Sequence, residues 1–195
     1  MKYIFLLLFL SISTSNFAQP NNALLQKGIR QYEKQNWTKA ENFFDKAIAQ
    51  DEMQAVAYCW KAKCLLQFQS FGEAYDYMQI ALQLEPTNPQ WHLEQGDLKM
   101  FVGQSSINKT AECNDCGKKI LPYHDGSIIA LDYYQSAIVD YKQAQALAPQ
   151  NGAIAYQLAV AYRNIGQQTD ACSMMQTAQK LNYKLALTQV STFCD

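Results

Sequence analysis

Apolar and small residues recur along the chain in a pattern that repeats. The shared unit is an alanine, a large apolar residue four positions later and a second alanine three positions after that. It occurs at Ala40-Phe44-Ala47, Ala74-Met78-Ala81, Ala137-Tyr141-Ala144 and Ala171-Met175-Ala178. Spacings of four and three place the three side chains on one face of an α-helix. The first alanines are 34, 63 and 34 residues apart, so the middle interval is one unit plus 29 further residues.

Prolines and glycines mark where these helices are expected to end. Pro86 and Pro149 each follow the last alanine of a unit by five residues, where proline stops a helix. Gly103 and Gly166 are expected in turns between helices, because glycine tolerates a positive φ. The pattern therefore predicts an all-α chain of paired helices.

The periodicity, the small pairs on the preceding helices and the prolines together resemble the tetratricopeptide repeat (TPR) family, whose 34-residue unit is a helix-turn-helix. The small pairs are Lys27-Gly28, Lys61-Ala62, Gln95-Gly96 and Leu158-Ala159. The resemblance implies a right-handed α-solenoid of about four repeats. We place them at about 21–54, 55–88, 89–103 continued at 129–151, and 152–185. The resemblance is to TPR proteins of the exported bacterial type.

A stacked repeat protein needs a lid, because the last hairpin cannot cover its own apolar face. Leu185, Leu187, Val190 and Phe193 predict an amphipathic capping helix over residues 185–195.

The N-terminus is typical of a secretory signal peptide. Lys2 precedes a short apolar run over residues 3–10, and Asn16-Phe-Ala18 precedes Gln19. Cleavage after Ala18 would leave a mature domain at 19–195, exported to the periplasm or secreted. The alternative is an uncleaved membrane anchor. No later segment approaches the roughly 20 apolar residues that a membrane helix needs.

Charge and composition exclude several functions. The net charge is -1, with 16 basic and 17 acidic residues, and losing Lys2 makes it about -2. A net charge this close to zero does not favour binding of nucleic acid, and it gives no basic patch for anionic lipid. The chain has two histidines, His92 and His124. The sequence contains no recognisable catalytic triad or phosphate-binding loop. We expect no enzyme activity and no cofactor.

Most of the 29 extra residues fall in a predicted insertion loop at 104–128 that contains Cys113 and Cys116. This Cys-x-x-Cys-Gly resembles half of a zinc ribbon, but zinc usually has four ligands. His124 could be a third ligand, whereas Cys59 and Cys64 lie about 140° apart around a helix. A local disulfide, a metal site, a redox pair and unpaired thiols all stay open. We expect a disulfide without metal, since exported chains favour it.

Cys172 and Cys194 invite a separate interpretation. A cysteine in the last hairpin with another near the chain end resembles the ending of many exported bacterial repeat proteins. That resemblance implies a Cys172–Cys194 disulfide, worth on the order of 3 kcal/mol in the chain-entropy model. The alternative is two buried thiols.

In TPR proteins the first helix of each unit lines a concave groove, and the resemblance implies the same here. The matching positions are Leu25, Ile29, Tyr32, Lys63, Leu66, Leu93, Asp97, Met100, Phe101, Tyr156, Val160 and Arg163. Chaperone-binding members hold a terminal carboxylate with a lysine at the fifth position, where this chain has Leu25, Cys59, Leu93 and Tyr156. The groove would therefore suit an apolar peptide. Alternatively, several of these residues pack on the lid or the insertion.

The sequence favours a non-enzymatic protein-interaction scaffold of the cell envelope, which binds a protein or peptide partner in its concave groove. The alternative is a periplasmic thiol/disulfide or metal-binding protein that uses the loop with Cys113 and Cys116.

Overall fold

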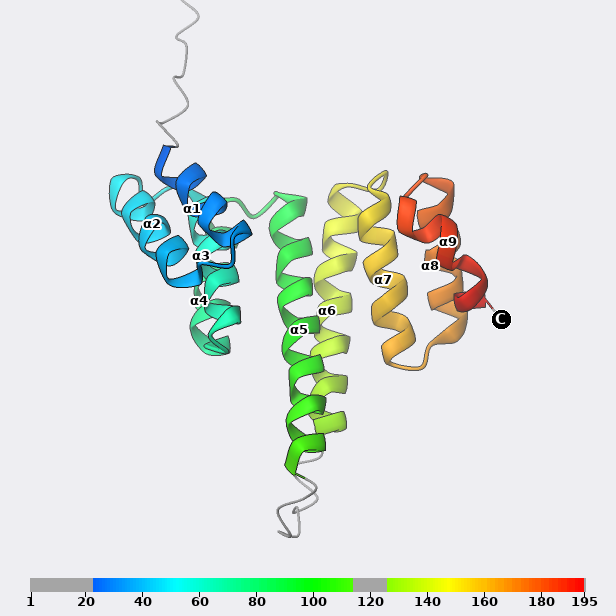
Figure 1. Cartoon of the computed structure of the whole chain (residues 1–195). Coiled ribbons are helices and arrows are strands. Elements are labelled where there is room, and N and C mark those ends of the chain that lie inside the picture. Colours follow the sequence, from blue (N-terminus) through cyan, green and yellow to red (C-terminus); the bar gives the residue numbers. More distant parts are fainter. Residues whose placement is uncertain (1–22, 114–125, 195) are drawn as a thin grey trace, which may run out of the picture.

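The computed structural model describes residues 23–113 and 126–194, and all the regular structure in this part of the chain is helical. Four antiparallel hairpins stand side by side and a final helix follows (Figure 1). The helices are α1 Ala23–Glu33, α2 Trp37–Gln50, α3 Ala55–Gln67, α4 Phe71–Leu84, α5 Pro89–Cys113, α6 Gly126–Leu147, α7 Gly152–Asn164, α8 Gln168–Lys180 and α9 Lys184–Cys194. The predicted all-α repeat solenoid is confirmed. The predicted signal peptide at 1–18 lies outside the described residues.

The repeated triplets form the buried seam of the solenoid. All twelve of their side chains, which lie on the second helix of each hairpin, are at most 4 % exposed. The small pairs on the first helices allow close approach. A Cβ on Gly28 would come within 2.5 Å of the Phe44 ring, and one on Gly96 would collide with the Tyr141 ring. At these two glycines a neighbouring ring occupies the space that a side chain would need.

The short turns inside the hairpins use a left-handed backbone conformation. Gly166 has φ +77°, as expected for a turn glycine. Gln35 and Gln69 occupy the corresponding turns with φ near 60° and 58°, so glutamine takes the role that glycine has in the fourth repeat. The interpretation of Gly103 as a turn residue is wrong, because it lies inside α5.

The third hairpin is much longer than the others. The predicted loop at 104–128 is wrong for 104–113 and 126–128, which are helical. α5 has 25 residues and α6 has 22, against 11 to 14 in the other hairpin helices. At about 1.5 Å per residue, α5 is about 37 Å long. Figure 1 shows this hairpin extending past its neighbours.

Side-chain packing explains why the two long helices continue. Tyr134 is buried, and its ring would lie only 2.8 Å from a Cβ atom placed on Gly103. Its hydroxyl lies 3.4 Å from Gln104 Oε1, and Ala130 is 1 % exposed. These contacts pair α5 with α6 around Gly103 and Ala130, where the predicted repeat meets the insertion.

α9 covers the end of the fourth hairpin. Ala186, Val190 and Phe193 face the core formed by α7 and α8, while Leu185 and Leu187 are 46 % and 50 % exposed. The expectation that these two leucines face inward is therefore wrong, since the spacing of four and three belongs to 186, 190 and 193. The sulfur atoms of Cys172 on α8 and Cys194 at the end of α9 lie at bonding distance from each other.

Candidate functional site

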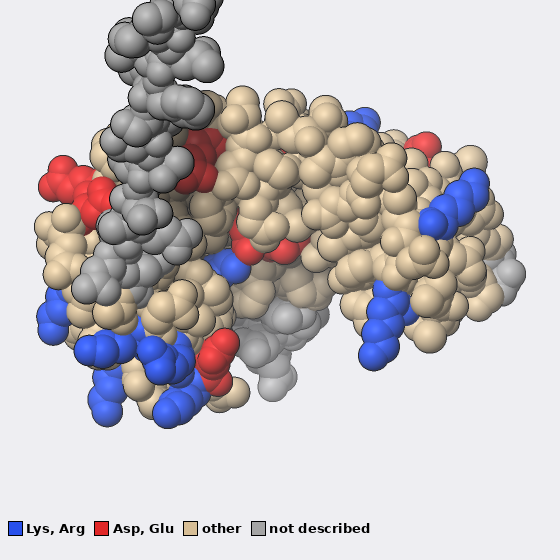
Figure 2. All heavy atoms as spheres, turned by 90° about the horizontal axis from the view of Figure 1, so that it is seen from above, with Lys and Arg blue, Asp and Glu red and all other residues tan. Residues whose placement is uncertain are grey.

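The first helices of the hairpins, α1, α3, α5 and α7, form the concave face of the solenoid. Seen from above, this face is a hollow between the two ends of the molecule, with charged side chains of both signs inside it (Figure 2). A row of such helices presents one stripe of side chains per repeat to whatever enters the hollow. Interaction chemistry is therefore expected on these four helices.

A cavity of about 310 Å³ opens on this face between α1, α3 and α5. Residues of α3 and α5 line it at intervals of three and four positions. The lining is Tyr32, Trp60, Ala62, Lys63, Leu66, Gln67, Met78, Glu94, Asp97, Leu98 and Phe101. Helical spacing makes one continuous wall from each helix, so aromatic and aliphatic surface surrounds a few polar groups.

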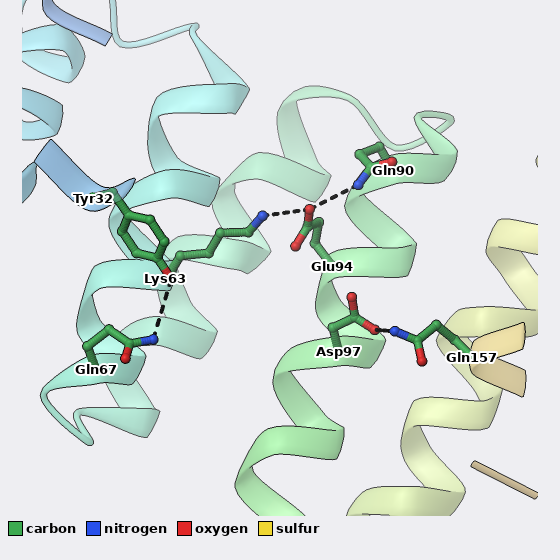
Figure 3. Close-up of polar contacts among 7 residues, drawn as sticks. All are labelled: Tyr32, Lys63, Gln67, Gln90, Glu94, Asp97 and Gln157. Carbon is green, nitrogen blue, oxygen red and sulfur yellow. Dashed lines mark hydrogen bonds and ion pairs between the residues drawn. The ribbon is translucent and has the colours of Figure 1, made fainter. Parts of the chain in front are cut away.

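An ion pair bridges the two walls of this cavity. Lys63 Nζ lies 2.7 Å from Glu94 Oε1, and Gln90 Nε2 donates to the same oxygen at 2.9 Å (Figure 3). The Lys63 ammonium also lies 4.7 Å from the centre of the Trp60 ring, a cation–π distance. The Tyr32 ring meets Trp60 edge-on at 5.2 Å. The ion pair thus fixes α5 against α3, while the Trp60 ring packs against the lysine.

Asp97 provides the second acidic group of the cavity. Its Oδ1 accepts hydrogen bonds from the Tyr141 hydroxyl at 2.7 Å and from Gln157 Nε2 at 3.0 Å. Figure 3 shows Gln157 approaching from the side opposite Lys63. Burial raises the pKa of Asp97 to about 6, and the Glu94 charge adds to this, although the Tyr141 hydrogen bond and Lys63 act in the opposite direction. Asp97 therefore changes charge a little below neutral pH.

The structure gathers five of the predicted groove residues around this cavity: Tyr32, Lys63, Leu66, Asp97 and Phe101.

Leu25 and Leu93 do not reach the groove. They are 2 % and 7 % exposed. Leu25 belongs to the core cluster around Phe44, and Leu93 to that around Tyr141. The expectation that these two leucines line the groove is wrong, because each packs against the large residue of its own hairpin.

At the far end of the concave face, three further predicted residues lie against the capping helix. The Tyr156 hydroxyl donates to Gln189 Oε1 at 3.0 Å, Val160 packs in the cluster that contains Phe193, and the Arg163 guanidinium lies 4.6 Å from the centre of the Phe193 ring. Ile29 and Met100 are partly buried against the core. The alternative interpretation, in which some of the predicted groove residues pack on the capping helix, therefore holds for the residues of α7.

Sequence reasoning missed Trp60, Gln67, Gln90 and Glu94. A signal for them was present. Trp60 and Gln67 lie three and four residues from Lys63, Glu94 lies three residues from Asp97, and Gln90 lies four residues from Glu94; such neighbours share a face of the helix. Reading whole faces, and not single repeat positions, would have found them.

Other reactive groups in the described residues do not assemble into a site. No cluster of three or more histidine, cysteine or acidic side chains there could hold a metal ion. Cys59 and Cys64 are buried, and burial raises the pKa of each thiol to about 12, which makes them poor nucleophiles. The side chain of Cys113, and Cys116 and His124, lie outside the described residues. None of the described helices has the length and apolar character of a membrane span.

Comparison with solved structures places the fold. The chain superposes on the TPR protein TTC0263 of Thermus thermophilus with a TM-score of 0.66 at 14 % identity, covering 88 % of this chain and 80 % of that one. For MamA of Desulfovibrio magneticus the TM-score is 0.62 at 13 % identity, with 88 % and 82 % covered. For the TPR domain of Arabidopsis OM64 it is 0.51 at 21 % identity, with 75 % and 93 % covered.

No protein-family model and no curated protein matches the sequence. At these identities the structural similarity establishes the fold alone. The chain has the TPR fold, and its function has to be argued from its site.

Proposed function

We propose that this protein is a non-enzymatic scaffold of the cell envelope that binds a protein or peptide partner in the concave cavity between α1, α3 and α5. One observation carries the proposal. Side chains from the first helices of three successive repeats, Tyr32, Lys63 and Phe101 among them, converge on one preformed cavity of about 310 Å³. Preformed concave sites with apolar walls and a few fixed polar groups are typical of ligand binding.

The lining favours a peptide with one apolar side chain. Leu66 and Phe101 supply apolar surface, and Phe101 is 43 % exposed. Gln67 and Asp97 supply polar groups for the peptide backbone or a neighbouring side chain. Because Lys63 is already paired with Glu94 at 2.7 Å, it is poorly placed to hold a terminal carboxylate. An internal segment of the partner, anchored by an aliphatic or aromatic residue, fits best.

Two features support location in the cell envelope. The first residues of the chain have the pattern of a signal peptide. The Cys172–Cys194 pair lies at bonding distance, and disulfides persist in oxidising compartments. Fractionation of cells expressing the full chain, with intact-mass measurement, tests this. Mature protein beginning near Gln19 in the periplasmic or secreted fraction is expected, and full-length protein in the cytosolic fraction would contradict the location.

A displayed library of random peptides, selected on the mature chain, tests the binding proposal. The selected peptides should share one large apolar residue. Their affinity should fall about tenfold or more in Leu66→Ser, which removes apolar wall. Met53→Ser is the matched control, because Met53 is 73 % exposed and lies outside the cavity lining.

Equal binding by wild type, Leu66→Ser and Met53→Ser would remove the cavity as the binding site. Circular dichroism of each variant separates lost binding from lost folding.

A further inference from the structure

A second hollow lies between α4, α5 and α6. Its volume is about 650 Å³, roughly twice that of the concave cavity. Leu98 and Val102 of α5 form its floor, while Phe71 and Tyr75 of α4 and Ile129 and Tyr133 of α6 form its walls. It is thus bounded by the second helices of adjacent repeats, with α5 between them, and Leu98 of α5 lines both this hollow and the concave cavity.

Large apolar side chains in this hollow are open to water. Tyr75, Ile129 and Tyr133 are 41 %, 39 % and 37 % exposed, although the buried floor beside them is 3 to 4 % exposed. Contiguous exposed apolar surface of this kind marks interaction sites in soluble proteins.

The hollow continues along the two helices. A cavity of about 440 Å³ is lined by Leu82 of α4 and Val139 of α6, among others, and Val139 is 66 % exposed. On α6 the residues that border the two cavities recur at about one helical turn, from Ile129 through Tyr133 and Ser136 to Val139 and Gln143. The two cavities therefore form one groove, the α4–α6 groove, along the 14 residues of α4, a length of about 21 Å.

The charge at the wider part of the groove is negative. Asp76 and Asp132 line the larger cavity. Of the residues that line it, only Lys99 is basic, and its ammonium lies 2.7 Å from Asp140 Oδ2. Because that ion pair neutralises the lysine, the two aspartates determine the charge that a partner meets.

We propose that the α4–α6 groove binds a basic amphipathic helix of a partner protein. Two helices with a groove between them can bind a third helix, whose ridges of side chains pack into that groove. A helix satisfies its own backbone hydrogen bonds, and so it suits walls made mainly of apolar side chains. Its apolar face would contact Leu98, Val102 and Tyr133, and lysines or arginines on its edges would lie beside Asp76 and Asp132. Electrostatic complementarity of this kind selects the partner.

The test uses the mature chain and a fluorescent peptide of about 14 residues made of leucine and lysine, with leucines at helical spacing. Its twin carries glutamate in place of every lysine. The lysine peptide should bind at least about tenfold more tightly than the glutamate peptide. Tyr133→Ser and, as a second variant, Tyr75→Ser should each weaken the lysine peptide about tenfold, and Asp132→Asn about threefold. All three side chains are exposed, so the fold should survive.

Matched controls lie elsewhere on the surface. Leu187→Ser on α9, where Leu187 is 50 % exposed, and Asp170→Asn on α8 should leave binding unchanged. Leu66→Ser, which alters the concave cavity, should also leave it unchanged, so the two proposed sites fail independently.

Three results would overturn the inference. The first is equal binding of both peptides, or none. The second is unchanged affinity in Tyr133→Ser and Tyr75→Ser, or lost affinity in Leu66→Ser, which would move the peptide to the concave cavity. The third is a dimer in sedimentation equilibrium that Tyr133→Ser dissociates, because the occupant would then be a second copy of this chain.

Discussion

The two halves of the concave face use equivalent helices in opposite ways. In the N-terminal half, Tyr32 of α1 and Lys63 of α3 line an open cavity. In the C-terminal half, Tyr156 and Arg163 of α7 contact Gln189 and Phe193 of the capping helix. In one half these side chains face an open cavity, and in the other they hold α9 in place.

This difference shows what a repeat position specifies. The register of the repeat determines the direction in which a side chain points from its helix. Whether that side chain is available depends on the next element of the stack. Along most of the solenoid the next element is another first helix, whereas after the fourth hairpin it is α9, whose Cys194 lies at bonding distance from Cys172 of α8.

Weakening the packing of α9 on the fourth hairpin should have the largest effect on the stability of the fold. Phe193 is 4 % exposed and packs with Met175 and Ala159. Phe193→Ala should lower the free energy of unfolding by about 3 kcal/mol, through lost burial and the cavity that it leaves. Urea denaturation measures this, with Leu187→Ala on the exposed side of α9 as control, for which a change below about 0.5 kcal/mol is expected. Similar losses in both variants would mean that α9 does not cap the fold.

Removal of the expected Cys172–Cys194 disulfide should have the second largest effect on stability. Replacing Cys172 and Cys194 with serine should cost on the order of 3 kcal/mol, less any strain in the native bond. The closed loop spans a sequence separation of 22. Reduced wild type should then match the double variant in urea denaturation.

Peptide mapping without reduction provides the independent measurement for this link. Fragments joined through Cys172 and Cys194 are expected, and alkylation of both cysteines without prior reduction would contradict the bond. Binding to the open half should be unchanged by the double substitution.

The sequence predicted the helical repeats better than it predicted the residues of the concave cavity, and the reason is physical. Ala74, Met78 and Ala81 are buried as the 34-residue period requires, because that period arises from packing between hairpins. The period carries no information about the insertion, and so the helical extension to Cys113 was missed. Glu94 was missed for a related reason. Its role depends on Lys63 of the preceding repeat, 31 residues away, and that pairing appears only once the hairpins are stacked.

A smaller effect is expected at Asp97 in the open half. Its pKa of about 6, against an ordinary 3.8, means that the folded protein holds this proton more tightly than the unfolded chain. The associated stability is present below about pH 4 and is lost as pH rises through 6. Asp97→Asn removes that ionisation. At pH 7 the variant should be more stable than wild type by about 1 kcal/mol, after a discount for partial exposure.

The pH dependence is the sharper measurement for Asp97. The stability difference between Asp97→Asn and wild type should shrink towards pH 4, in urea denaturation at several pH values. A difference independent of pH would show that the Asp97 carboxylate is solvated as in the unfolded chain and that burial does not raise its pKa.

The smallest expected effect compares one tyrosine from each half. The Tyr156 hydroxyl donates to Gln189 Oε1 at 3.0 Å across the α7–α9 contact. The Tyr32 hydroxyl accepts from Gln67 Nε2 at 3.4 Å beside the open cavity. Removing the first hydroxyl in Tyr156→Phe leaves Gln189 without this donor, and should cost about 1 kcal/mol. Removing the second in Tyr32→Phe should cost less than about 0.5 kcal/mol, because water reaches an exposed contact of that length. Equal costs in urea denaturation would mean that the two halves are solvated alike, and that α9 rests on the concave face without closing it.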